Sequence, residues 1–145
     1  ESDETIITIK DFEHQEELKQ ELEKVIQSFN NADVKACVEK DPSYYKPFVS
    51  ADLYKDLQSQ IERMKEKDYF IELELDEIEY NEIKFDKNIN KVLFHVKEVW
   101  SSTDVYSDGT KDTYEPHTIK WVYKLYKGGD GTWYIENNYE DFGLW

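Results

Sequence analysis

The chain has 145 residues and a net charge of −15, from 18 basic and 33 acidic side chains. This length is typical of one domain with a sizeable core, and aromatic residues, 15% of the chain, supply enough apolar area to exclude a disordered protein. The negative charge excludes a general binder of nucleic acid, which needs a basic face, and argues against docking on anionic lipid. No run of about 18 apolar residues is present, so we expect no membrane span within the sequence.

The chain opens with a polar stretch. We expect residues 1–10 to be a weakly structured lead-in and residues 11–145 to form a single domain, because no linker or repeat divides them. Glu1 rather than methionine stands first. We therefore interpret the sequence as a piece of a longer protein, with any signal or anchor upstream.

The first half of the chain predicts three helices. Apolar residues at helical spacing predict a first helix that ends at Asn30-Asn31. A short second helix is expected over residues 33–39. The third helix is predicted to begin after the N-cap residue Ser50 and to run to about Lys67.

The second half predicts four strands of an antiparallel sheet, because apolar and polar residues alternate from Tyr69 onward. The alternation changes phase at Asp76-Glu77, which predicts a β-bulge. Turns are expected at residues 86–90 and 128–131. One face of the second strand carries Val92, Phe94, Val96, Glu98 and Trp100. One face of the third carries His117, Ile119, Trp121, Tyr123 and Leu125. Helices followed by a bent sheet predict an α+β cone, with three N-terminal helices packed on a curved antiparallel sheet of about four strands.

Two polar residues interrupt these apolar faces. Glu98 and His117 would meet if the hairpin between their strands is centred near Ser107, because Glu98 then lies opposite Pro116 or His117. A carboxylate beside an imidazole in a partly dry pocket can act as general base and acid, with Tyr80 and Tyr123 as hydroxyl donors. The alternative is a structural ion pair at the rim of the sheet, which is the more common outcome for such pairs.

The loop after Trp100 has the composition of a calcium site. Its acidic candidates match positions of a calcium-binding loop, but Tyr106 occupies a ligand position and the flanks are strands rather than helices. The candidates are Asp104, Asp108, Asp112 and Glu115. The alternative is an acidic hairpin loop with Asp-Gly at its tip, and we expect no metal and no cofactor. Cys37 is the only cysteine, which excludes an internal disulfide and a cysteine-based metal site.

Aromatic residues on the inner face suggest a binding surface. Trp100, Trp121 and Tyr123 could stack on a sugar or an apolar ligand, as could Trp133, although inward aromatic residues more often belong to the core. His14 and His95 are isolated, and a lone histidine is more often satisfied or exposed to solvent than a metal ligand.

The whole pattern resembles the nuclear-transport-factor-2-like (NTF2-like) superfamily. More narrowly, it resembles the C-terminal domain of TcaA-type membrane proteins of Gram-positive bacteria. The resemblance covers roughly residues 12–138 and depends on the segments Phe29–Asp33, Ser43–Tyr45, Pro47-Phe48, Val96–Trp100, Lys120–Leu125 and Gly129–Ile135.

This resemblance implies a cellular setting. Proteins of the TcaA type have a cytoplasmic zinc ribbon, one membrane helix and a string of extracytoplasmic domains. The resemblance therefore implies a membrane-anchored domain on the outer face of the membrane, with its anchor outside these residues, and a cell-envelope role that in some members is linked to the glycopeptide-antibiotic response. A homodimer through the open face of the sheet is left open.

Three functional hypotheses follow. We favour a non-catalytic binding module for a protein or cell-wall component, with no nucleic-acid partner. The first alternative is a small lyase or isomerase that uses Glu98 and His117, since superfamily enzymes such as ketosteroid isomerase and scytalone dehydratase place Asp, His and Tyr in the cone. We do not transfer those catalytic roles to this chain. The second alternative is a structural domain whose cavity is filled by its own aromatic side chains.

Overall fold

The computed structural model describes residues 9–85 and 90–141. The elements in chain order are α1 (Ile9–Glu39), a 3₁₀ helix η1 (Pro42–Phe48), α2 (Ala51–Glu66), β1 (Tyr69–Phe85), β2 (Lys91–Tyr106), β3 (Lys111–Lys127) and β4 (Trp133–Glu140). Within the described residues, no helix is both long and apolar enough to cross a membrane.

The first helix does not end where the sequence predicts. α1 is 31 residues long and continues through Asn30-Asn31. The predicted first and second helices are therefore one element, and the predicted break between them is wrong. Asparagine disfavours a helix interior mainly because its side chain competes for backbone hydrogen bonds. The buried Asn30 side chain instead bonds Glu98 on the sheet, which removes that competition. The helix ends at Glu39, and the next residue, Lys40, has a left-handed φ of 56°.

The other two helices, η1 and α2, bring the number of helices to three, although the sequence predicted no helix at the position of η1. η1 starts after Asp41, whose carboxylate accepts a hydrogen bond from the Ser43 amide at 2.9 Å. The predicted N-cap of α2 is confirmed, because Ser50 Oγ accepts from the Leu53 amide at 3.1 Å. The Ser50 amide also donates to the Ile135 carbonyl at 2.9 Å, which fixes the start of α2 against β4.

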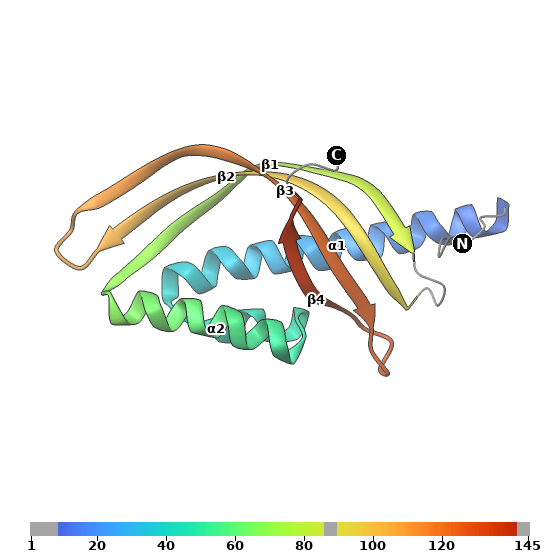
Figure 1. The fold of residues 1–145 in the computed structure, drawn as a ribbon, viewed down its shortest axis with the longest axis horizontal. Coiled ribbons are helices and arrows are strands. Elements are labelled where there is room, and N and C mark those ends of the chain that lie inside the picture. The colour runs from blue at the N-terminus through green and yellow to red at the C-terminus, as the bar shows by residue number, and fades with distance from the viewer. Residues whose placement is uncertain (1–8, 86–89, 142–145) are drawn as a thin grey trace.

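The four strands form one antiparallel sheet in the order β1-β2-β3-β4. The sheet arches over α1 and α2, which lie along its concave face (Figure 1). The predicted β-bulge is confirmed by a register shift between Leu75 and Glu77. The sequence did not predict the further shifts in β1, in the β2–β3 pairing and in the β3–β4 pairing. Because bulges bend strands, these shifts account for the strong curvature of the sheet. Of the turn predicted at 86–90, residues 86–89 lie outside the described part of the chain.

The concave face of the sheet and the helices enclose the core. The predicted inner face of β2 is confirmed, since all five of its residues are buried: Val92, Phe94, Val96, Glu98 and Trp100. The aliphatic and phenylalanine side chains of this face pack with the buried stripe of α1, including Leu22, Ile26 and Phe29. Burying one such large apolar side chain contributes about 1.5–3 kcal/mol, so this interface anchors α1 beneath the sheet. The predicted α+β cone is thereby confirmed.

Candidate functional site

A cavity of about 240 Å³ lies between the concave face of the sheet and both helices. Its lining comes from every α-helix and strand of the fold: Phe29, Asn30, Asp33, Leu57, Gln60, Leu73, Glu98, Trp100, Ser102, His117, Ile119, Trp121, Tyr123 and Asn138. No lysine or arginine is among these described lining residues. The cavity is smaller than the roughly 300–1,000 Å³ typical of sites for drug-sized ligands.

Glu98 lies at the centre of a buried polar network, with only 1% of its surface exposed. Its Oε1 accepts from Trp100 Nε1 at 2.7 Å. Its Oε2 accepts from the Tyr123 hydroxyl at 2.6 Å and from Asn30 Nδ2 at 3.2 Å. Three donors from two strands and one helix therefore hold this carboxylate in a fixed orientation.

Burial dominates the acidity of Glu98. Loss of hydration raises the pKa of its carboxyl group, and the hydrogen bonds from Tyr123, Trp100 and Asn30 offset part of that rise. The nearby Asp33 carboxylate adds a smaller upward shift of the pKa. The site therefore holds a carboxyl group that takes up a proton more readily than one in water.

A second acidic group lies one helical turn beyond Asn30. Asp33 Oδ1 accepts from the Tyr45 hydroxyl at 2.5 Å and from Cys37 Sγ at 3.6 Å. Burial is again the main cause that raises the pKa of Asp33. Cys37 is itself buried, and its burial together with the negative charge of Asp33 raises the pKa of its thiol far above the ordinary value. Cys37 is therefore an inert buried thiol.

The predicted contact between Glu98 and His117 is not formed. Glu98 pairs with Ile119 across the sheet, and His117 pairs with Trp100. The hairpin loop is centred near Asp108 rather than Ser107, and the register shift after Trp100 adds an extra residue on β3. His117 is exposed while Glu98 is buried, although both line the same cavity.

The two tyrosine candidates have different surroundings. Tyr123 is buried against Glu98, and burial followed by the charge of Glu98 raises the pKa of its hydroxyl. Tyr80 instead donates to the Glu23 carbonyl at 3.4 Å, and its ring is tilted against that of Phe94. Burial raises the pKa of Tyr80 to about 12. Tyr80 is not among the residues that line the cavity.

The predicted ligand-binding aromatic residues come together. Trp100, Trp121 and Tyr123 all line the cavity, and the rings of Trp121 and Tyr123 lie 6.3 Å apart. Trp100 and Tyr123 are buried, whereas Trp121 is half-buried, so its ring is the part of this wall nearest to solvent. Trp133 is buried in the core and does not line the cavity.

The calcium candidates do not gather into a cluster. Asp104 and Asp112 lie opposite each other on β2 and β3, and their carboxylates accept hydrogen bonds from Tyr114 and Tyr106. Asp108 caps the hairpin turn through Thr110. Across residues 9–85 and 90–141, no group of three or more His, Cys, Asp or Glu side chains could hold a metal ion. His95 lies on β2 opposite Val122, and His14 lies in the part of α1 whose side chains are not described.

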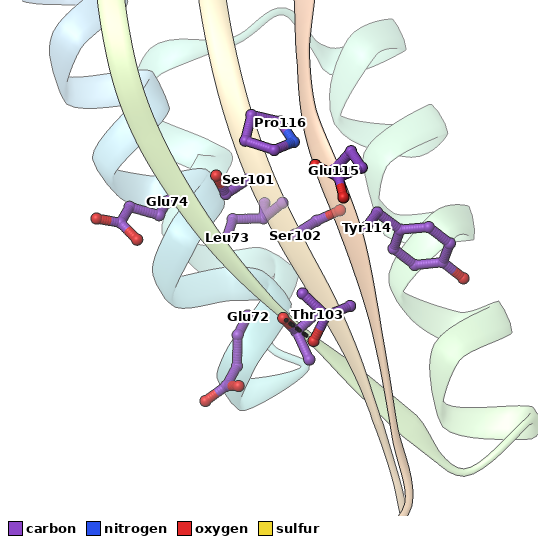
Figure 2. A pocket seen from close by; sticks show the side chains of 10 residues that line it. Glu72, Leu73, Glu74, Ser101, Ser102, Thr103, Tyr114, Glu115 and Pro116 are labelled. Carbon is purple, nitrogen blue, oxygen red and sulfur yellow. Dashed lines mark hydrogen bonds between the residues drawn. The ribbon is translucent and has the colours of Figure 1, made fainter.

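An open hollow of about 510 Å³ lies on the outer face of the sheet, with the helices behind it (Figure 2). Glu72 and Glu74 lie on one side of it and the exposed ring of Tyr114 on the other. A hydrogen bond of 3.2 Å joins the hydroxyl groups of Thr103 and Thr113 across its floor. This surface carries exposed acidic side chains, whereas the carboxylate at the centre of the inner cavity, Glu98, is buried.

Sequence reasoning missed the polar residues that the helices contribute. Asn30 and Asp33 occupy positions of the apolar stripe of α1, between Ile26 and Cys37 at helical spacing. Glu98 was found because it interrupts an apolar face, and the same signal was present for Asn30 and Asp33. The interruption of the apolar stripe by Asn30 and Asp33 was not recognised, because the first helix was predicted to end at Asn30-Asn31.

A helical layer beneath a curved four-stranded antiparallel sheet, with a cavity between them, defines an NTF2-like domain. The model of the YvbJ NTF2-like domain family matches residues 22–139, and the chain belongs to this family. The predicted superfamily is thereby confirmed, and the resemblance to TcaA-type proteins is consistent with this family.

The fold is also found among solved structures. The fold is similar to that of the intermembrane space region of the chloroplast protein ARC6, with a TM-score of 0.74 and 9% sequence identity. The likeness covers 84% of this chain and 95% of the other, and at this identity it shows the fold alone. No curated protein matches the chain.

Proposed function

We propose that this domain is a non-catalytic binding module of a membrane-anchored envelope protein, and that part of its ligand enters the inner cavity. The observation that carries the proposal is the cavity itself, where the aromatic side chains of Trp100, Trp121 and Tyr123 surround a fixed carboxylate. Aromatic walls with a few oriented polar groups are the usual composition of a small-ligand site.

The same geometry favours binding over catalysis. A general base needs, in most mechanisms, a second group that accepts or returns a proton. Three donors hold the Glu98 carboxylate, and His117 contacts neither of its oxygens by hydrogen bond. This arrangement holds the carboxylate in one orientation and supplies no second group that exchanges a proton with it.

The proposed location is the outer face of the cell membrane. Support comes from the family match, because the resemblance to TcaA-type proteins implies an extracytoplasmic domain beyond a membrane helix. We propose a protein or cell-wall component as the partner.

A lyase or isomerase is the second candidate, favoured by one observation: Glu98 and His117 line the same cavity. An enzyme of this type requires a substrate bound between the two side chains. It predicts turnover that is lost in both Glu98→Gln and His117→Ala, whereas a binding module predicts that His117→Ala keeps full ligand affinity.

The test is a ligand titration that is monitored by two-dimensional NMR. The probes are fragments of cell-wall chemistry: alanyl-lysine dipeptides and N-acetylglucosamine oligomers. The Trp100 indole N–H reports on the cavity because it bonds Glu98 directly. We expect at least one probe to give saturable shifts at Trp100 and Trp121 with no chemical change in the probe. Shifts confined to the outer face, or no shift with any probe, would contradict the proposal, and conversion of a probe would favour the enzyme.

A further inference from the structure

We infer that the group which enters the inner cavity is an ammonium ion on a narrow apolar stem, such as the lysine side chain of a peptide. The inference rests on the proposed function, that the cavity is a binding site, and it specifies the chemistry of the ligand.

The charge of the cavity is the first argument. Glu98 and Asp33 both line it, and no lysine or arginine does so among the described residues. The other polar lining comes from the amide side chains of Asn30, Gln60 and Asn138, from Ser102 and Tyr123 and from the exposed His117. A buried carboxylate with no cationic partner is costly, and a bound cation would offset that cost.

The geometry of the Glu98 carboxylate is the second argument. An ionised carboxylate offers about four acceptor positions, and the hydrogen bonds from Asn30, Trp100 and Tyr123 fill three of them. Oε2 accepts from two donors, Tyr123 and Asn30, whereas Oε1 accepts from one, Trp100. Oε1 therefore keeps one acceptor position, which suits a donor such as an ammonium group.

The size and walls of the cavity are the third argument. A volume of about 240 Å³ fits one side chain rather than a drug-sized molecule. The rings of Trp100, Trp121 and Tyr123 can pack against a methylene stem, and aromatic faces also attract a cation, with tryptophan the strongest. A neutral apolar stem would leave the acceptor position on Glu98 Oε1 unused. An anion would be repelled by the carboxylates of Glu98 and Asp33.

The outer hollow provides the competing location. Glu72, Glu74 and Glu115 line it, and the whole chain carries a charge of −15, so a cation is also drawn to that surface. These carboxylates are exposed, and Glu72 already lies 4.0 Å from Lys111. Interactions between exposed charges are weak and are screened by salt. Binding in the inner cavity should therefore persist at a salt concentration that removes binding outside.

The experiment compares two probes that share a stem and differ in charge. These are Nα-acetyl-lysine N-methylamide and its neutral analogue Nα-acetyl-norleucine N-methylamide, titrated into the domain and followed at the Trp100 and Trp121 indole N–H signals. We expect saturable binding of the lysine probe and at least about tenfold weaker binding of the norleucine probe, which is the effect of one good charge-assisted contact.

Two variants and one control locate the contact. Glu98→Gln removes the charge with little change in shape and should weaken the lysine probe about tenfold. Glu74→Gln removes an outer-face charge and should leave its affinity unchanged. If Glu98→Gln does not fold, Trp121→Leu serves instead, because it spares the buried network and should weaken the lysine probe about fivefold through loss of the cation–π contact.

Each outcome decides between the claims. Equal binding of both probes in the cavity would overturn the ammonium inference and leave the proposed binding function standing. Lysine-probe shifts that appear only around Glu72, Glu74 and Tyr114, and that vanish with added salt, would overturn the inference as non-specific attraction. If neither these probes nor the glycan and dipeptide probes shift the Trp100 and Trp121 signals, the inference and the proposed function both fail.

Discussion

The Tyr123 hydroxyl donates a 2.6 Å hydrogen bond to Glu98 Oε2, between two side chains that are not directly opposite in the β2–β3 pairing. Glu98 pairs with Ile119 and Tyr123 pairs with Phe94, so the tyrosine reaches along the concave face to the carboxylate. Tyr123 is 1% exposed, and its ring packs edge-on against Phe29 of α1. This contact ties the buried charge to the packing of helix on sheet.

Tyr123→Phe removes that hydroxyl and keeps the ring. A buried carboxylate that loses one donor keeps its desolvation cost, so we expect a loss of about 1–3 kcal/mol in the free energy of unfolding. The pKa of Glu98 should also rise further, because the Tyr123 hydrogen bond now lowers it. Urea denaturation measures the first effect. A change below about 0.5 kcal/mol, the level of a neutral surface substitution, would show that the contact is not made in solution.

Glu98→Gln tests the pKa of the buried acid through the pH dependence of stability. Because the folded-state pKa of Glu98 lies above its unfolded value, the favourable term is fully present below the unfolded pKa of about 4.3. It is lost as the pH rises through the folded-state pKa. The wild type should therefore lose stability relative to Glu98→Gln as the pH is raised above the unfolded pKa.

The measurement is urea denaturation of both proteins at pH values from below the unfolded pKa upward. The difference between them cancels the contributions of surface groups such as Asp41 and Glu136, whose pKa values are lowered. A difference that is constant with pH, or that moves in favour of the wild type as the pH rises, would mean that burial does not raise the pKa of Glu98.

How far the sequence predicts this protein depends on which residues carry the signal. Alternation along β2 correctly predicts its buried face, and Ser50 correctly predicts the start of α2, because both signals are local. The course of α1 could not be predicted, because the partner that satisfies Asn30 lies 68 residues away. The pairing of His117 with Trp100 was also not predicted, because one extra bulge residue in β3 changes which side chains meet across the sheet.

Asn30→Ala and its neighbour Asn31→Ala form a matched pair on the same helix. Asn30 is 3% exposed and donates to Glu98, whereas Asn31 is exposed. Alanine favours the helix at both positions, so Asn31→Ala should be neutral or slightly stabilising. Asn30→Ala should destabilise the domain by about 1–3 kcal/mol, because Glu98 loses a partner inside the core. Equal stability of the two variants in thermal or urea unfolding would contradict the role given to Asn30.

Cys37 should be unreactive in the native protein. Its side chain is buried, and burial together with the charge of Asp33 raises the pKa of the thiol, so that the reactive thiolate is scarce. A thiol reagent such as dithionitrobenzoate should label it only as fast as the domain opens, and rapidly in denaturing urea. Fast labelling without urea would show that the end of α1 is open to solvent.

A crystal structure of the domain grown with saturating Nα-acetyl-lysine N-methylamide tests the central claim most directly. We predict that the probe lies in the cavity between Trp100 and Trp121, with its ammonium nitrogen within about 3 Å of Glu98 Oε1. A probe bound only at the outer hollow, or an empty inner cavity beside a saturated surface, would contradict it.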